Sequence, residues 1–231
     1  MEDSSSHQHD RTSLQDHIRR YVEGEICRGQ FAPGSAIDER ALAGAFKSSR
    51  TPVREALLIL SMQGLVEIRP RSGIYVRRPG AAELVALFEA LTEIEAVVAS
   101  LAAQRADKAG HAALNQALEA CGRMAKKSDP QSYAKANDAF HAALYRYSAN
   151  PIIVDQVRSI RARLAAFRLR VFDRPGRLLA SYGEHRQVVE RILAGDAEGA
   201  ARAMRYHISS GGKGFADLVL SSGGKTERAV R

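Results

Sequence analysis

The pattern of apolar and polar positions divides the chain near residue 79. Before this point, two short helical stretches are followed by two segments in which apolar and polar residues alternate, which predicts a little β-structure. After it, apolar residues recur every three or four positions to about residue 220, and no segment there alternates as a strand does. The sequence therefore predicts a mainly α protein with a mixed N-terminal domain and an all-helical second domain.

Capping residues and prolines mark the helix boundaries of the second domain. Asp129-Pro130, Asn150-Pro151, the stretch 173–176 and Gly195-Asp196 each separate two apolar stretches. Such short connections join antiparallel neighbours, so we expect an antiparallel bundle. The expected helices cover residues 81–107, 110–127, 130–148, 151–172, 176–194 and 196–220.

A helix start is well marked near residue 51 in the first domain. Thr51 is a suitable N-cap, Pro52 a suitable first helical residue, and Glu55 is placed to complete a capping box. A shorter helix at 38–46 precedes this one, and a polar turn at 47–49 joins the two. Two short helices joined in this way predict a helix-turn-helix.

Two arginines lie four residues apart at this helix start. Arg50 would precede the helix and Arg54 would lie on its first turn, the part of a recognition helix that reaches base edges in the major groove. Either guanidinium would bind a guanine through two hydrogen bonds. These residues predict sequence-specific DNA binding, against the alternative of a solvated basic surface on another kind of small helical domain.

A basic hairpin is expected directly after the recognition helix. Residues 65–68 and 73–76 have the pattern of two short strands, and Arg69 and Arg71 lie in the tip between them. A hairpin in this position is a wing, which lays arginine against the minor groove or the phosphates. From residue 40 to 78 there are eight Lys and Arg against two Asp and Glu, in a chain of net charge +8, so double-stranded DNA is the expected partner.

Composition excludes several other classes of protein. No apolar run approaches the roughly 20 residues of a membrane span, so we expect a soluble protein with no membrane partner. Cys27 and Cys121 fall in different predicted domains without CxxC spacing, which fits a reducing cytoplasm. Residues 1–12 are polar and lack the apolar segment of a signal peptide, so they predict a disordered arm, and 221–231 predict a flexible tail.

Three histidines of the predicted bundle have a spacing that lets them meet. Asn137 and His141 are four residues apart and share one helix face. His185 and His207 are equally distant from the turn at residue 196, so they lie at the same height in an antiparallel hairpin. If the helix at 130–148 packs alongside, three imidazoles and one amide oxygen form a site for zinc or a similar divalent ion. The alternative is three unrelated helix histidines.

The N-terminal motifs resemble the winged-helix domain of GntR-family transcription regulators over about residues 14–78. The stretches that carry the resemblance are 29–42, 49–57, 63–66 and 71–73. The DNA contacts that it implies, in a domain placed at 13–78, are Arg40, Ser49, Arg50, Thr51, Arg54 and Gly73. Lys47-Ser48 departs from the family, which usually has Gly-Val there, so we expect a turn of slightly different shape.

The second domain, placed at 79–220, resembles the FCD-type effector domain of the FadR subfamily of these regulators. The resemblance rests on residues 137–145, 150–151, 184–186, 194–197 and 200–208. It implies a divalent metal, zinc or else nickel or manganese, with a small carboxylate effector in its open coordination positions. The implied metal ligands are Asn137, His141, His185 and His207. The first of these is more often Asp in the family.

A further arginine is a candidate for binding the effector. By the symmetry of the hairpin about residue 150, Arg163 lies level with Asn137 and would reach a carboxylate as a planar fork. The alternative is that the arginines of this stretch form a solvated face or contact the DNA-binding domain or a second subunit. The helix at 81–107 is apolar on more than one face, which favours a homodimer and hence an operator that is an inverted repeat.

The function predicted from the sequence is a cytoplasmic transcription regulator whose affinity for operator DNA is controlled by a small carboxylate bound at a metal site. No catalysis is expected. One alternative is a metal-dependent hydrolase-like enzyme fused to a DNA-binding head, because three histidines with open positions would activate water. The other is a winged-helix dimer that binds no ligand.

Overall fold

The structure is a computed structural model that describes the backbone of residues 3–223 and the side chains of residues 14–165 and 171–212. It confirms the predicted fold class. The chain separates into two compact units, Met1–Pro79 and Gly80–Arg231, each described here by itself.

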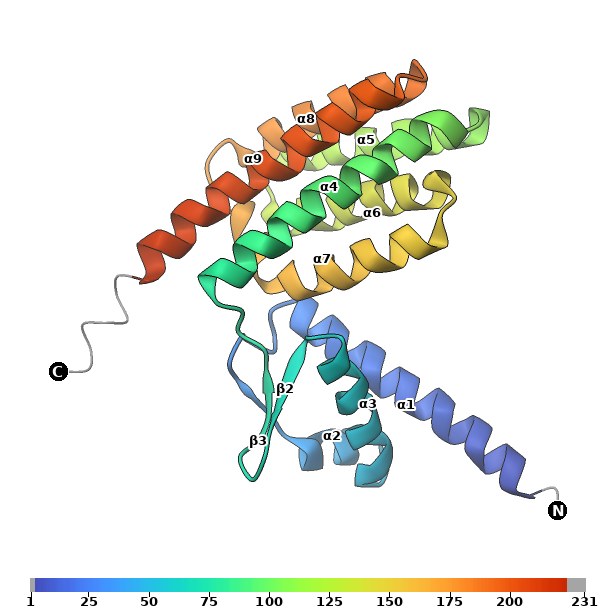
Figure 1. Ribbon diagram of the computed structural model, residues 1–231, viewed down its shortest axis with the longest axis vertical. Coiled ribbons are helices and arrows are strands. Elements are labelled where there is room, and N and C mark those ends of the chain that lie inside the picture. The colour runs from blue at the N-terminus through green and yellow to red at the C-terminus, as the bar shows by residue number, and fades with distance from the viewer. Residues whose placement is uncertain (1–2, 224–231) are drawn as a thin grey trace. The chain divides into compact units, whose positions relative to one another are not determined.

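The N-terminal unit contains helices around a small sheet (Figure 1). Its elements are α1 (Asp3–Cys27), β1 (Ala36–Ile37), α2 (Glu39–Ala45), α3 (Arg50–Met62), β2 (Val66–Arg69) and β3 (Gly73–Val76). The antiparallel sheet has the order β1-β3-β2, so β2 and β3 form the predicted hairpin wing and β1 lies on its other edge. Helix α1 packs against α3, which contributes Val53, Leu57 and Leu60 to the core.

The chain termini differ from the sequence prediction. Helix α1 begins at Asp3, so residues 3–12, predicted as a disordered arm, are helical. Polar composition does not exclude this, because a helix forms its backbone hydrogen bonds within the segment. At the other end, α9 (Ala197–Gly223) takes in the first residues of the predicted tail, and 224–231, like 1–2, lie outside the described residues.

The start of α3 also differs from its prediction. The helix begins at Arg50 with Ser49 as its N-cap, so Thr51 is not the N-cap and the capping box with Glu55 is wrong. Several residues around this turn have side chains that suit an N-cap, and the capping preference does not choose among them. The structure buries Pro52 in the third helical position and leaves Thr51 exposed.

The second unit is the predicted helical bundle (Figure 1). Its helices besides α9 are α4 (Ala81–Arg105), α5 (Lys108–Lys127), α6 (Pro130–Ser148), α7 (Pro151–Val171) and α8 (Arg177–Leu193). Helix α4 contacts α6, α7, α8 and α9, while α5 packs against α6 and α8. No helix in the described part of the chain is long and apolar enough to cross a membrane.

Candidate functional site

Three helices of the bundle carry a histidine on the face that they bury. On α6, Tyr133, Asn137, Phe140 and His141 follow one another at helical spacing, and all four side chains are buried. Helices α8 and α9 bury His185 and His207 in the same way. All three rings are therefore shielded from water, and any polar partner of their nitrogens must come from the protein.

The structure brings the three histidines together, as their spacing predicts. The Nε2 atoms of His185 and His207 are 3.2 Å apart. One ring nitrogen from each of His141, His185 and His207 lies within 4.8 Å of those of the other two. The symmetry of the α8–α9 hairpin therefore predicted the pairing of the last two histidines correctly.

A buried carboxylate of α4 holds the first histidine. Glu95, which is 0% exposed, lies 3.3 Å from Nδ1 of His141. It also accepts hydrogen bonds from the Tyr145 hydroxyl at 2.5 Å and from Arg161 at 2.6 Å. Glu95 was not predicted as a site residue, although an acidic residue among Leu91, Ala96 and other apolar positions of this helix was the available signal.

A second carboxylate holds His207 in the same manner. Glu184 lies 2.7 Å from Nδ1 of His207 and accepts two hydrogen bonds of 2.7 Å from Arg177. Ser210 donates a further bond of 2.8 Å to it. This role of Glu184 was not predicted from the sequence, although Glu184 directly precedes His185 in the chain. A carboxylate at Nδ1 fixes the ring and directs the Nε2 lone pair toward the cluster.

The environment keeps the imidazoles neutral and the carboxylates ionised. Burial, together with the charge of Arg161, lowers the pKa of His141 to about 3, and burial also lowers the pKa of His185 and His207. Burial opposes ionisation of Glu184, but hydrogen bonds from His207 and Arg177 outweigh it and lower its pKa to about 2. Near neutral pH, the rings are therefore ready to act as ligands without losing a proton.

His185 lacks a carboxylate partner. Its ring stacks on Phe140 with centroids 4.0 Å apart. Its Nδ1 is buried and has no hydrogen-bond partner among the described residues. Stacking on Phe140 and the contact between its Nε2 and that of His207 therefore set the orientation of this third imidazole.

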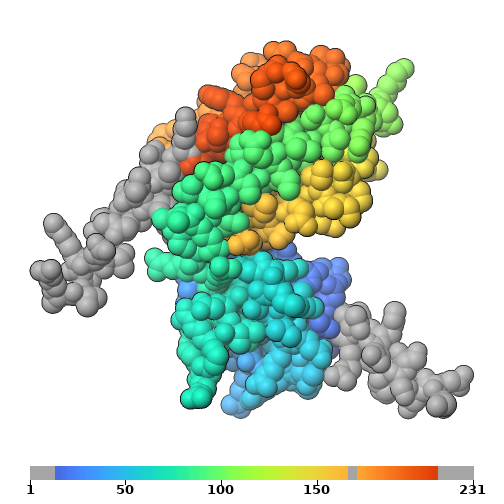
Figure 2. Space-filling model, in the orientation of Figure 1, coloured from blue at the N-terminus to red at the C-terminus, as the bar shows by residue number. Residues whose placement is uncertain are grey.

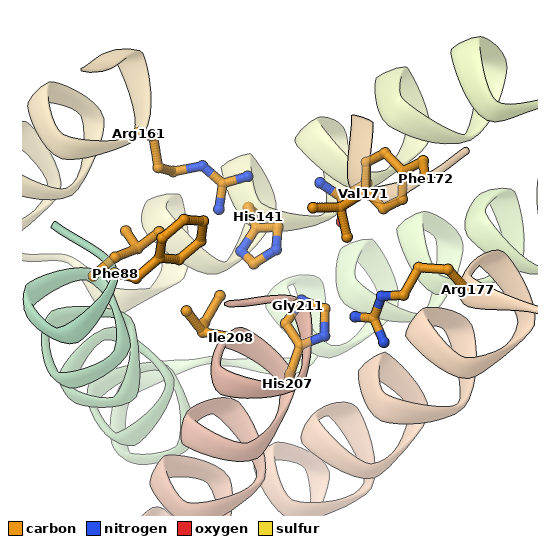
Figure 3. Close-up of a pocket in the computed structure, with 11 residues that line it drawn as sticks. Phe88, His141, Arg161, Val171, Phe172, Arg177, His207, Ile208 and Gly211 are labelled. Carbon is orange, nitrogen blue, oxygen red and sulfur yellow. The ribbon is translucent and has the colours of Figure 1, made fainter. Parts of the chain in front are cut away.

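A small pocket opens beside the histidines (Figure 3). It encloses about 50 Å³, and its polar lining includes Asn137, His141, His207, Arg161 and Arg177. The amide nitrogen of Asn137 donates to Asp138 at 3.4 Å, so the amide oxygen is its candidate ligand atom. Asn137 therefore lies where the sequence placed it, next to two of the three histidines.

The predicted role of Arg163 is corrected by the structure. Arg163 donates to Glu83 of α4 at 2.6 Å and does not line the pocket, whereas Arg161 does. The hairpin symmetry gave the correct height along α7. It did not give the correct side, because residues two apart on a helix point about 200° apart.

All eight residues predicted to contact DNA are exposed on the N-terminal unit. They are Arg40, Ser49, Arg50, Thr51, Arg54, Arg69, Arg71 and Gly73. The apolar residues between them on α3 are buried instead, so the helix presents its polar side to solvent. The tip of the hairpin, in turquoise, projects from the surface of this unit (Figure 2).

Local contacts arrange some of these arginines. Arg54 pairs with Glu39 of α2 at 2.7 Å, and the Arg69 guanidinium lies 4.5 Å from the centre of the Tyr75 ring. In the turn before α3, Lys47 has a φ of 49°, a left-handed conformation that glycine adopts more readily. Lys47 thus keeps the backbone conformation that the family's glycine would favour, at the steric cost that a side chain carries in the left-handed region.

Comparison with known families supports this architecture. Residues 14–76 match the model of bacterial regulatory proteins of the gntR family, and residues 86–210, more than half of the chain, match the FCD domain. The chain belongs to the GntR family. It combines a winged-helix domain with an FCD domain, the architecture of the FadR subfamily.

Relatives resemble this GntR-family chain over most of their length. A probable D-xylose utilization operon transcriptional repressor of Paenarthrobacter nicotinovorans is 27% identical over 231 residues, which is 99% of each chain. The transcriptional regulator LutR of Bacillus subtilis is 29% identical and covers 80% of this chain and 93% of its own. The chain is therefore a transcription regulator, and the enzyme alternative is set aside.

Solved structures share the fold. E. coli McbR/YncC matches with a TM-score of 0.79 at 21% identity, over 89% of this chain and 98% of its own. A GntR regulator from Rhodococcus sp. RHA1 matches with a TM-score of 0.72 at 20% identity, over 90% of this chain and 98% of its own.

Proposed function

We propose that this regulator controls its affinity for operator DNA through a small carboxylate effector bound at a divalent metal in the FCD domain. The observation that carries this proposal is the cluster of three buried histidines, two of them held at Nδ1 by Glu95 and Glu184. Carboxylates behind imidazoles are a recurrent second shell of metal sites.

The donor set fits a divalent transition metal. For a tetrahedral ion with bonds to nitrogen of about 2.0–2.1 Å, two ligand nitrogens lie about 3.3 Å apart. The His185 and His207 Nε2 atoms are separated by 3.2 Å, close to that spacing. Imidazole ligands suit zinc and nickel better than calcium, magnesium or manganese, so we propose zinc, with nickel ahead of manganese as the alternative.

The residues of the site explain why the effector would be an anion. His141, His185, His207 and the Asn137 amide are all neutral ligands, so a bound metal would supply an uncompensated positive charge with open coordination positions. Glu95 and Glu184 are already paired with Arg161 and Arg177 and do not neutralise it. A carboxylate would balance the charge.

We also propose that the regulator acts in the cytoplasm as a homodimer on an inverted repeat. Each copy would present α3 to one half-site and the β2–β3 wing to the adjacent backbone. On α4, Val85 and Val97 are exposed, and a second copy would cover such apolar side chains.

Metal analysis combined with DNA binding tests this function. The wild-type protein is expected to retain about one divalent ion per chain, and effector should change its operator affinity. His185→Ala should lose both the ion and the effector response while keeping effector-free DNA binding. His111→Ala is the matched control, because His111 lies on α5 outside the cluster. A His185→Ala protein with wild-type metal content and response would refute the proposal.

A further inference from the structure

The pocket beside the histidines has a charge balance that selects among carboxylates. Its cationic side chains within the described residues, apart from the imidazoles, are Arg161 and Arg177. In Figure 3 both guanidinium groups extend toward the histidines, Arg161 toward His141 and Arg177 toward His207. Whether they are available to an effector depends on what they already bind.

Both guanidinium charges are already neutralised. Arg177 forms a two-pronged pair with Glu184, with both distances 2.7 Å. Arg161 pairs with Glu95 at 2.6 Å and with Asp138 at 3.2 Å. A second carboxylate entering the pocket would therefore meet arginines whose charge is balanced, and it would lie beside Glu95 or Glu184.

The rest of the pocket lining is largely apolar. The other lining residues in the described part of the chain are Phe88, Leu91, Val171, Phe172, Ile208 and Gly211. Figure 3 shows Phe88 and Ile208 on one side of His141 and His207, with Val171 and Phe172 on the other. A ligand hydroxyl placed among these side chains would lose its water without gaining a partner, which costs roughly 1–3 kcal/mol.

The size of the pocket limits the length of the ligand. It encloses about 50 Å³. On the scale where one water needs about 10–15 Å³, this volume corresponds to roughly three to five water molecules. A short aliphatic acid fits within this space, whereas a sugar acid or a tricarboxylate would extend out of the open side of the pocket.

We infer that the effector is a short-chain aliphatic monocarboxylate of about three or four carbons, whose alkyl group lies among Phe88, Val171 and Ile208. This inference rests on the proposed function, because the carboxylate is assigned to the metal. The apolar walls select the alkyl chain, and the paired arginines reject a second carboxylate. In a rival arrangement, a second carboxylate of the ligand would bind the Nε of Arg177. This nitrogen is buried without a partner in the described structure.

Four-carbon acids that differ only at the far end test the inference by calorimetry on the zinc-loaded, full-length protein. Butyrate should bind, whereas 4-hydroxybutyrate and succinate should each bind about 10- to 100-fold more weakly. Acetate should bind about tenfold more weakly than butyrate, since each methylene buried contributes about 0.8 kcal/mol. Removing zinc with a chelator should abolish butyrate binding.

One isosteric substitution tests whether the apolar wall sets the selectivity. Val171→Thr replaces a methyl group on the pocket wall with a hydroxyl at nearly constant volume. The ratio of the affinity for butyrate to the affinity for 4-hydroxybutyrate should therefore fall by about tenfold. Val154→Thr is the matched control, because Val154 is buried on the same helix but does not line the pocket. That variant should keep the wild-type preference.

The outcomes separate this inference from the function on which it rests. If succinate or 4-hydroxybutyrate binds as tightly as butyrate, the inference is overturned but the proposed metal-carboxylate function is not. If succinate binds more tightly than butyrate, the result favours the arrangement in which Arg177 binds a second carboxylate. An unchanged preference in Val171→Thr would also overturn the inference. If none of these acids binds the zinc-loaded protein, the inference alone is overturned. If butyrate binds equally well without zinc, the proposed function fails as well.

Discussion

The Nε2 atoms of His185 and His207 lie 3.2 Å apart although the two residues are 22 positions apart in the chain. Without a metal, one of the two nitrogens must carry a proton, because two lone pairs at this distance repel each other. Nδ1 of His207 faces Glu184, so the proton belongs on Nε2 of His185, which leaves its Nδ1 without hydrogen. This tautomer explains why a buried Nδ1 of His185 has no acceptor beside it.

Glu95 is expected to be critical for the stability of the bundle. Glu95→Gln removes the buried charge that compensates Arg161 and leaves Arg161 paired with the exposed Asp138, so it should lower the free energy of unfolding by up to about 3–5 kcal/mol, measured by urea denaturation. Glu93 on the same helix pairs with Arg205 at the surface, so Glu93→Gln should change the stability by less than about 1 kcal/mol. Equal effects of the two substitutions would contradict the role assigned to Glu95.

The stability of the metal-free protein should fall as the pH is lowered below 6.5. His141 has a pKa lowered from 6.5 to about 3 by burial, so between these values the unfolded chain binds a proton that the folded chain does not. This contributes up to about 1.4 kcal/mol per pH unit. Above pH 6.5 the histidine is neutral in both states and the contribution to the slope vanishes.

Urea denaturation between pH 6.5 and 5 measures this slope. In this range Glu184, whose pKa is lowered to about 2, stays ionised in the folded protein. Among the groups of the site, the histidines therefore contribute most to the slope. His141→Gln should reduce the slope of the free energy of unfolding against pH by the contribution of one proton, up to about 1.4 kcal/mol per pH unit. A slope that the substitution leaves unchanged would show that His141 is not buried in its neutral form.

Substitutions on α3 should separate base recognition from general attraction to DNA. Arg50→Ala and Arg54→Ala should each cost about 1–3 kcal/mol on operator DNA and little on random DNA, because both exposed side chains are placed for base edges. Titration of labelled duplexes at a fixed salt concentration measures both. Equal losses on the two kinds of DNA would count against base recognition.

The wing should behave differently from α3. Arg71 lies at the exposed hairpin tip, where we expect it to contact phosphate. Arg71→Ala should weaken binding to all sequences and reduce the slope of log affinity against log salt by about one unit. A salt slope identical to that of the wild type would show that Arg71 does not contact the DNA phosphates.

Restoring a charge at the first ligand position should change metal and effector affinity in opposite directions. Asn137→Asp should tighten metal binding by about tenfold or more, because a carboxylate is a stronger ligand than an amide. The same charge would oppose a carboxylate effector at the same ion. Asn115→Asp makes the identical change at an exposed position of α5 and should alter neither affinity in calorimetry. Tighter effector binding in Asn137→Asp would speak against an anionic effector.

Much of the bundle could be predicted from the sequence because its signals are local. Prolines and caps such as Asp129-Pro130 set the helix ends, and the structure begins α6 at Pro130. The meeting of His185 and His207 followed from a tight hairpin, in which equal distance from the turn means equal height. These inferences need only the regular rise of a helix.

Features that depend on distant packing could not be predicted in this way. Glu95 meets His141 from 46 positions away, and no local pattern encodes how α4 rotates against α6. The choice between Arg161 and Arg163 is of the same kind, since spacing fixes position along α7 but not its rotation about its own axis. The start of α3 was misplaced because Thr51 was assigned as the N-cap, whereas the helix starts after Ser49, and both are residue types that suit an N-cap.

Three donors from three positions converge on the single carboxylate of Glu95, and this limits how the site can evolve. Losing Glu95 in one step would remove the acceptor that His141, Tyr145 and Arg161 share, so it would disturb three buried donors at once. His185 is held by stacking on Phe140 and by its contact with His207, with no carboxylate at its Nδ1 in the described structure, so its replacement disturbs fewer partners. If the proposed switch is lost in a lineage, His185 should therefore be replaced early and Glu95 should persist.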